Sequence, residues 1–162
     1  MLRLQGAIRT AERLLSVTTE RIEPAVPPDA EAIQGLLSAA SLAVADLAVS
    51  PVRLWVVRDG TRVAGAAGLE RYGNAAILRS LVIDSTARGR GLGQRLVAVL
   101  EDDARASGVK ALVLLTRSAA PFFERLGYRV TDRLSVSDAI RRSAEFAALC
   151  PMSAVCMSKS LS

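Results

Sequence analysis

The chain has 162 residues, which suits one domain with a substantial core, and 51% of them are apolar, as in a typical globular protein. It has no histidine, which excludes Ser-His-Asp triads and imidazole metal sites, and its two cysteines are too few for a four-thiolate cluster. The net charge of +5 suits an anionic small molecule or a nucleic acid and does not choose between them.

The first 19 residues differ in composition from the rest of the chain. They carry several arginines and little acid, like a transit peptide, and lack the continuous apolar core of a secretory signal. A lead-in helix or a partner-binding arm is the alternative. We expect residues 1–19 to form an N-terminal extension, as a lead-in helix or a partly ordered segment, and residues 20–162 to form a single domain. Without a secretory signal, reduced cysteines and a cytoplasmic location are expected.

The first half of the domain alternates between apolar segments and turn signals. Apolar residues at helical spacing follow Pro27 and Pro28 and predict a helix through residue 40. Asp59-Gly60 is a hairpin signal between two apolar runs, and Tyr72-Gly73-Asn74 predicts another turn. Strands are expected at 21–26, 53–58, 61–70 and 75–83.

The second half has the pattern of crossover units. A glycine-rich segment, residues 88–93, leads into a helical stripe that ends at Ser107-Gly108. Further strands are expected at 110–115, 128–134 and 154–158, with helices at 120–126 and 137–149. An antiparallel meander followed by crossovers predicts an α/β (α+β mixed) fold. Its central sheet would be mixed, mostly antiparallel and twisted, with helices on both faces.

The glycine-rich segment carries the clearest chemical signal. Arg88, Gly89, Arg90, Gly91, Leu92 and Gly93 follow an apolar strand and open a helix. Glycines let the backbone approach a ligand closely, and the start of a helix adds free amides and a positive dipole end. The spacing R-x-x-G-x-G fits neither the Rossmann fingerprint nor the Walker A motif. It predicts a phosphate or pyrophosphate site.

The segment L-R-S-L-V-I-D-S-T-A-R-G-R-G-L-G, residues 78–93, resembles the acetyl-CoA motif of the GNAT acetyltransferase superfamily. The downstream A-A-P-F-F-E-R-L-G-Y, residues 119–128, resembles its second signature, and the likeness covers about residues 21–160. The resemblance implies a GNAT-like fold, a single acetyltransferase domain, acetyl-CoA as co-substrate and no metal. It maps the pyrophosphate to residues 88–93 and the pantetheine arm to the backbone of Leu81, Val82 and Ile83.

Other segments are similar to the arsenic-resistance acetyltransferase family, whose relatives acetylate the α-amine of arsinothricin. They are S-L-A-V-A-D-L (41–47), G-L-E-R-Y-G (68–73) and L-C-P-M-S-A-V-C-M (149–157). This likeness implies an N-acetyltransferase that moves the acetyl group directly to the amine of a small molecule. The implied acceptor is arsinothricin or a similar amino-acid analogue, and the implied role is arsenic resistance and detoxification.

Direct transfer needs a base for the acceptor amine, and without histidine the base is a carboxylate or solvent. Glu70 is the first candidate for a general base, because its strand neighbours the strand that holds the cofactor. The alternative is a glutamate that faces solvent at the end of a strand. Asp46 is either a residue of the acceptor pocket or a loop residue.

Arg79 and Ser80 precede the cofactor-binding part of their strand and are candidate substrate-binding residues. Arg79 either clamps an acidic group of the acceptor or forms an internal salt bridge. Ser80 points to the opposite face by strand alternation, unless a bulge redirects it. Phe123 stands where many members of the superfamily have the tyrosine that protonates the thiolate. Cys150 and Cys156 are read as structural residues.

Two other functions remain open from the sequence. One is an N-acetyltransferase for a peptide or protein amine, and the other is a non-catalytic acyl-CoA-binding module. A small-molecule amine is the expected partner, with no nucleic acid and no membrane. Homodimers are common in the superfamily, so the resemblance implies a homodimer as a hypothesis.

Overall fold

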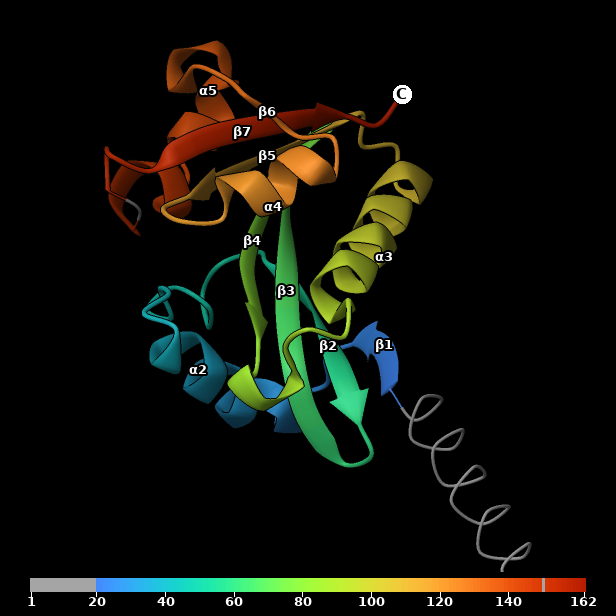
Figure 1. Ribbon diagram of the computed structural model, residues 1–162. Coiled ribbons are helices and arrows are strands. Elements are labelled where there is room, and N and C mark those ends of the chain that lie inside the picture. Colours follow the sequence, from blue (N-terminus) through green and yellow to red (C-terminus); the bar gives the residue numbers. More distant parts are fainter. Residues whose placement is uncertain (1–19, 150) are drawn as a thin grey trace, which may run out of the picture.

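The computed structural model describes residues 20–149 and 151–162, which build one seven-stranded sheet. Its order is β1-β2-β3-β4-β5-β7-β6, and every neighbouring pair is antiparallel except β4 and β5. This confirms the predicted mixed, mostly antiparallel sheet (Figure 1). The strands are β1 (Glu20–Pro24), β2 (Arg53–Asp59), β3 (Arg62–Tyr72), β4 (Ala75–Ile83), β5 (Ala111–Thr116), β6 (Arg129–Val130) and β7 (Val155–Ser160).

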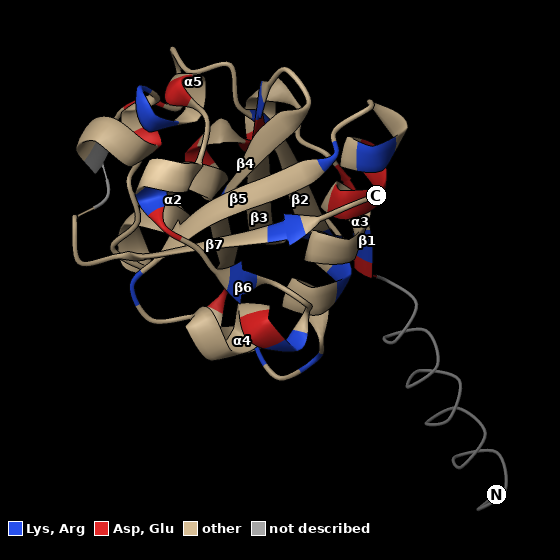
Figure 2. Ribbon diagram, turned by 90° about the horizontal axis from the view of Figure 1, so that it is seen from above, with Lys and Arg blue, Asp and Glu red and all other residues tan. Residues whose placement is uncertain are grey.

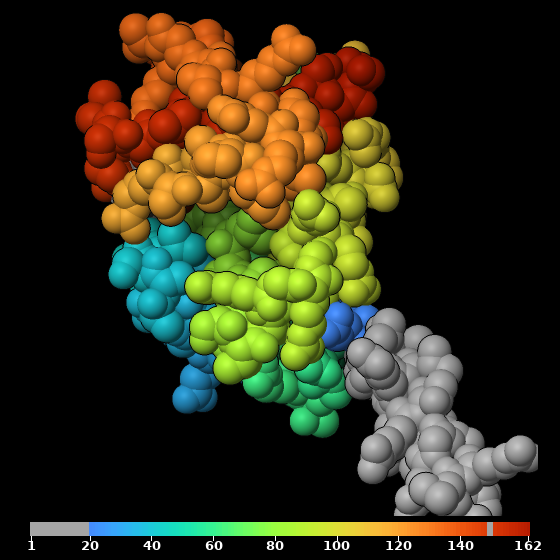
Figure 3. All heavy atoms as spheres, in the orientation of Figure 1, coloured from blue at the N-terminus to red at the C-terminus, as the bar shows by residue number. Residues whose placement is uncertain are grey.

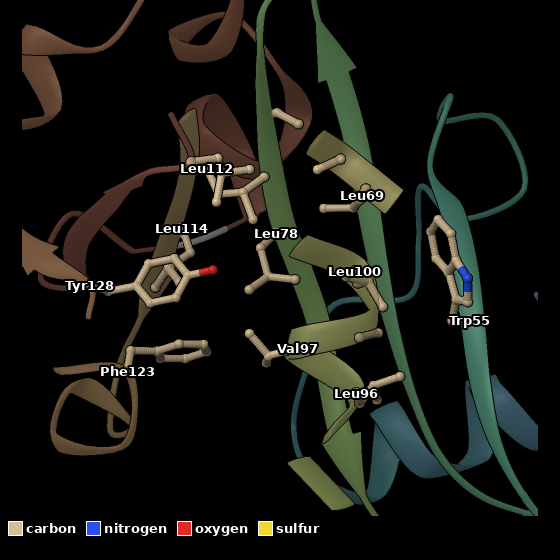
Figure 4. Packing of buried hydrophobic residues seen from close by; sticks show 14 of the residues in the cluster. Trp55, Leu69, Leu78, Leu96, Val97, Leu100, Leu112, Leu114, Phe123 and Tyr128 are labelled. Carbon is tan, nitrogen blue, oxygen red and sulfur yellow. The ribbon is translucent and has the colours of Figure 1, made fainter. Parts of the chain in front are cut away.

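Helices cover both faces of the sheet, as the sequence predicts. Strand alternation divides β2 between the faces: Trp55 and Val57 pack with α3 (Leu92–Ala106), whereas Val56 packs with α2 (Ala30–Ala39). The larger core, on the α3 side, includes Leu96, Leu100 and the aromatic pair from α4 (Ala120–Arg125) and the segment after it (Figure 4). A third cluster lies under α5 (Asp138–Arg141).

The strands β4 and β5 separate part-way along their length. Their parallel pairing covers three positions and ends at Ile77 and Val113, while β5 stays paired with β7 as far as Thr116. Beyond Ile77, the edge of β4 that faces β5 is therefore left open. Because strand edges present unpaired N–H and C=O groups, this part of β4 can accept an extended ligand as an added strand.

Two predicted elements differ from those observed. The strand expected at 128–134 is only β6, because Asp132 accepts a hydrogen bond from the Leu134 amide and starts a 3-10 turn. The helix expected at 137–149 is split into α5 and the π-helical turn η4 (Glu145–Leu149). Between them Ser143 bonds to the Ile140 carbonyl and the Phe146 amide, competing with the helical pattern. Residues 1–19 and Cys150 lie outside the described residues.

Gly65 holds β3 close to β4. A Cβ at this position would lie 2.9 Å from the Val82 carbonyl oxygen and 2.7 Å from Ile83 Cδ1. We expect Gly65→Ala to lower the free energy of unfolding by about 1–3 kcal/mol, because the backbone of β4 would have to shift. Chemical denaturation measures this change.

Gly35 offers a matched control in α2, because a Cβ there meets nothing within 4 Å. Gly35→Ala should raise the free energy of unfolding by about 0.5–1 kcal/mol through helix propensity. Equal effects of the two substitutions would contradict the close approach of β3 and β4.

Candidate active site

A cavity of about 560 Å³ occupies the space that the separation of β4 and β5 leaves. Figure 3 shows it as a hollow in which the atoms of β4 lie behind those of the surrounding loops. Its walls come from β4, from the segments after α2 and β5, and from the C-terminal region. They include Leu78–Ile83, Arg88, Leu114–Ala119, Phe123, Glu145, Pro151 and Ala154, together with residues 40–43.

A β-bulge shapes the wall formed by β4. Ala66 pairs with Val82 and Gly68 with Arg79, so Ser80 and Leu81 together face the one residue between them on β3. Ser80 takes a left-handed conformation (φ 59°), which is rare for a residue with a side chain. As a result Arg79 and Ser80 both line the cavity, and Arg79 Nε donates to Ser80 Oγ over 3.1 Å. The bulge therefore removes the strand alternation that would have separated them.

The glycine loop joins β4 to α3 at one end of the cavity. Gly89 (φ 81°) and Gly91 (φ 73°) adopt the left-handed conformation that favours glycine, and Gly91 is the N-cap of the 15-residue helix α3. Arg88 lines the cavity, and its Nε donates to the Ile83 carbonyl over 3.3 Å. The free amides of the first turn and the positive dipole end make this an anion-binding geometry.

The other candidate residues of the loop play different parts. Arg90 Nη1 forms an ion pair with Glu20 on β1 over 2.9 Å, and Nη1 of Arg95, in the first turn of α3, pairs with the same carboxylate over 3.4 Å. Leu92 is buried in the larger core, and its side chain packs with Leu96 and Leu100 of that cluster. Gly93 lets the Phe122 ring approach, because a Cβ there would lie 3.3 Å from the ring.

Arg79 is the centre of a buried ionic cluster at the other end of the cavity. Its fully buried guanidinium binds Asp46 through Nη1 (2.6 Å) and Nη2 (2.9 Å), and Glu70 through Nη1 (2.7 Å). Burial alone would lower the pKa of Arg79, but the hydrogen bond to Asp46, the charge of Glu145 and the hydrogen bond to Glu70 raise it. Of the two alternatives for Arg79, the internal salt bridge is the one present in this structure.

Glu70 does not face solvent, so that alternative is wrong: the residue is 1% exposed. Its Oε1 accepts from Ser50 Oγ and Arg79, and its Oε2 accepts from the Tyr72 hydroxyl over 2.8 Å. Neither Glu70 nor Asp46 contributes to the cavity wall. The hydrogen bond from Arg79 lowers the pKa of the Asp46 carboxyl.

Two charged residues that line the cavity escape the sequence analysis. Glu145, at the start of η4, lies 3.5 Å from Arg79 Nη2, and Arg117, after β5, donates to the Ser41 carbonyl over 2.7 Å. Neither belongs to a recognisable motif. The one available signal was that a buried arginine needs acidic partners, which does not say which of the sixteen acidic residues supplies them.

No tyrosine stands against the cavity in the described part of the chain. Phe123 does, and Tyr128 packs on it edge-to-face with its ring 5.4 Å away. The Tyr128 hydroxyl is buried, and burial followed by the charge of Glu101 raises its pKa. Cys156 is a buried free thiol in the cluster under α5, and burial raises its pKa as well. It has the packing expected of a structural cysteine.

A model of the acetyltransferase (GNAT) domain matches residues 50–130, half of the chain. The chain belongs to the GNAT acetyltransferase family. An IAA acetyltransferase of Azospirillum brasilense is 39% identical to this GNAT chain over 72 residues, which are 43% of this chain and 47% of that protein. The match thus spans about half the length of this curated relative.

Solved structures share the GNAT fold across most of the chain. Rv2747 of Mycobacterium tuberculosis, in complex with CoA, has a TM-score of 0.74 at 22% identity, covering 86% of this chain and 98% of that one. A Staphylococcus aureus acetyltransferase of the GNAT family reaches 0.71 at 16% identity, covering 88% and 99%. Neisseria gonorrhoeae N-acetylglutamate synthase, in complex with CoA and N-acetyl-glutamate, reaches 0.75 at 18%, covering 88% of this chain and 35% of its own.

Three features of the described residues concern possible membrane, metal and nucleic-acid partners. In the described residues no helix is both long and apolar enough to cross a membrane. Over the same residues, no group of three or more Cys, Asp or Glu side chains is arranged to hold a metal ion. Lysine and arginine are spread over several elements and interspersed with acidic residues (Figure 2).

Proposed function

We propose that this chain is an N-acetyltransferase that moves the acetyl group of acetyl-CoA directly to the amine of a small molecule. The observation that carries the proposal is the cavity that joins the glycine loop to the Arg79 cluster along the open edge of β4. Family membership adds the chemistry, and relatives of the same fold were solved with CoA. The acetyltransferase domain would cover residues 20–162.

Each part of acetyl-CoA has a matching surface in this proposal. The amides of residues 88–93 and the N-terminus of α3 would bind the pyrophosphate, with Arg88 adding charge. The backbone of Leu81, Val82 and Ile83 would pair with the pantetheine arm, which takes the place that β5 leaves open. A backbone N–H near Val82 would polarise the thioester carbonyl, so a side-chain substitution there would change little.

The chemistry is a direct transfer. The acceptor amine attacks the carbonyl carbon, a C–N bond forms, and the C–S bond breaks as CoA leaves as the thiolate. A thiol pKa near 8.5 makes the thiolate a fair leaving group, so water can protonate it in the absence of a tyrosine beside the cavity. Phe123 at that position also favours a second candidate function, a non-catalytic module that binds acyl-CoA.

The acceptor is proposed to be an amino-acid analogue, with arsinothricin the first to test. The resemblance of segments 41–47, 68–73 and 149–157 to the arsenic-resistance family supports this choice. Residues 41–43 of the first segment and Pro151 and Ala154 of the third border the cavity, which supports the choice of acceptor. The cytoplasmic location and the homodimer stay predictions.

Release of free thiol from acetyl-CoA tests the function. The chain is mixed with acetyl-CoA and, in turn, arsinothricin, phosphinothricin, glutamate, a polyamine and a basic peptide. We expect CoA release with arsinothricin and not with the peptide. Release with another small amine would keep the N-acetyltransferase and discard the arsenic assignment. Tight binding of acetyl-CoA with no release for any amine would favour the acyl-CoA-binding module.

A further inference from the structure

Three carboxylates share one arginine beside the cavity. Asp46, Glu70 and Glu145 all lie within 3.5 Å of the guanidinium of Arg79, whose side chain is fully buried. With all three ionised, the cluster carries two negative charges more than the arginine neutralises. Charges in a region with little water are weakly screened, so this excess acts strongly on a cation in the cavity. The cluster is therefore suited to attract the ammonium form of an amine.

Only one of the three carboxylates lines the cavity. Asp46 uses both oxygens in a bidentate pair with Arg79, and both oxygens of Glu70 accept hydrogen bonds from the protein. Glu145 belongs to the cavity wall together with Ser80 of the β4 bulge. An acceptor amine in the cavity can thus reach Glu145 without displacing the inner pairs.

The fold holds Glu145 at this position from two sides. Its neighbour Phe146 is buried in the cluster with Ile140, Val113 and Cys156, which fixes the turn η4 against the sheet. On the other side, Arg79 fixes the carboxylate itself. A residue whose backbone and carboxylate are both fixed in place is preorganised to bind a ligand.

We propose that Glu145 is the carboxylate that binds the acceptor ammonium and removes its proton, and that Arg79 is the residue that positions it. The proposal rests on the proposed function. One proton passes from the ammonium to a carboxylate oxygen of Glu145, and the freed lone pair attacks the thioester carbon. The C–S bond then breaks and the sulfur leaves with its electron pair. The thiolate takes up a proton from water, the second amine proton goes to water, and Glu145 then releases its proton to solvent. Glu70 and Asp46, in this account, serve to hold Arg79.

Substitution of Glu145 tests the assignment. With arsinothricin as the probe, or the fastest amine of the panel if arsinothricin is inert, Glu145→Gln should lower kcat/KM for the acceptor at least about 100-fold. The KM for acetyl-CoA should stay within about twofold, and Glu145→Asp should restore part of the rate. The exposed Glu124 on α4 does not line the cavity, so Glu124→Gln is the matched control and should leave both constants unchanged.

The pH profile separates a proton-transfer role from a structural one. Among the described residues, the charged groups that bear on Glu145 include Arg79, which pairs with it, and Asp46 and Glu70, which share that arginine. Arg117 lines the same cavity. In the wild type, kcat/KM for the acceptor should fall at acidic pH as a carboxylate protonates, and this limb should be missing in Glu145→Gln. Thermal denaturation confirms that each variant is folded. If Glu145→Gln does not fold, the same rate and pH measurements are made on Glu145→Asp.

The failure of this assignment can be told apart from failure of the proposed function. If the wild type turns over and Glu145→Gln keeps kcat/KM for the acceptor within about threefold of the wild-type value, with an unchanged acidic limb, the assignment of Glu145 is overturned. The N-acetyltransferase function would then still stand. No thiol release by the wild type with any amine would overturn the proposed function itself.

Discussion

Replacement of Gly91 by glutamate is expected to abolish binding of acetyl-CoA. Gly91 is the N-cap of α3 in the left-handed conformation, and a Cβ there would meet no protein atom within 4 Å. The new carboxylate would therefore enter the space that the pyrophosphate is proposed to occupy, where like charges repel and the helix dipole would be satisfied by the protein itself. We expect the Kd for acetyl-CoA to rise at least about 100-fold, which corresponds to about 2.8 kcal/mol.

Isothermal titration measures the affinity, and Gly73→Glu provides the matched control. Gly73 is also left-handed (φ 65°) with open space around it, but it lies in the turn between β3 and β4, at the other end of β4 from the glycine loop. Both variants carry the same backbone cost and the same added charge. Gly73→Glu should bind acetyl-CoA like the wild type, and a Gly91→Glu variant that did the same would refute the pyrophosphate mapping.

The second large effect is expected on stability, from removal of Arg79. Arg79→Ala would leave Asp46, Glu70 and Glu145 close together without their shared cation. Removal of one partner from a buried ionic cluster costs about 3–5 kcal/mol, and we expect a loss of this size in the free energy of unfolding at pH 7. Urea denaturation followed by circular dichroism measures it. Arg117→Ala, which removes an exposed arginine, should change stability by less than about 0.5 kcal/mol.

The pH dependence of this loss follows from the direction of the Asp46 shift. The hydrogen bond from Arg79 lowers the pKa of Asp46 below its ordinary value of 3.8. A carboxyl with a lowered pKa contributes stability that is present above its ordinary pKa and is lost as the pH falls through the folded value. The difference between wild type and Arg79→Ala should thus be complete at pH 7 and shrink below about pH 4. A loss under about 1 kcal/mol at pH 7 would contradict the role of the cluster in stability.

Local signals in the sequence were enough to predict most elements of the fold. The apolar runs, the Asp59-Gly60 turn and the stripe of α3 each depend on neighbours along the chain, and the structure has each of them. The prediction of one continuous helix over 137–149 was wrong for a local reason, because Ser143 competes for backbone groups that such a helix would use. The effect of Ser143 depends on side-chain geometry, which the spacing of apolar residues does not reveal.

The candidate site was harder to predict, because its acceptor end is made of distant residues. The glycine loop is contiguous, so its spacing alone indicates an anion site. Arg79, however, finds Asp46 33 residues earlier and Glu145 in a turn near the other end of the domain. The bulge at Ser80 depends on the register between β3 and β4, which no periodicity in β4 encodes. Glu70 was therefore the natural candidate from sequence, and Glu145 became visible only with the cavity.

Acetyl-CoA is proposed to bind along the open edge of β4 and against the glycine loop. Titration of the ¹⁵N-labelled chain with CoA, followed through its backbone amide signals, tests this claim most directly. We expect the largest changes at residues 81–83 and 88–93, with little change at Trp55, Arg71 and Ser107, which line a separate cavity of about 260 Å³. Changes centred on that second cavity, or none at residues 81–83 and 88–93 under saturating CoA, would contradict the account.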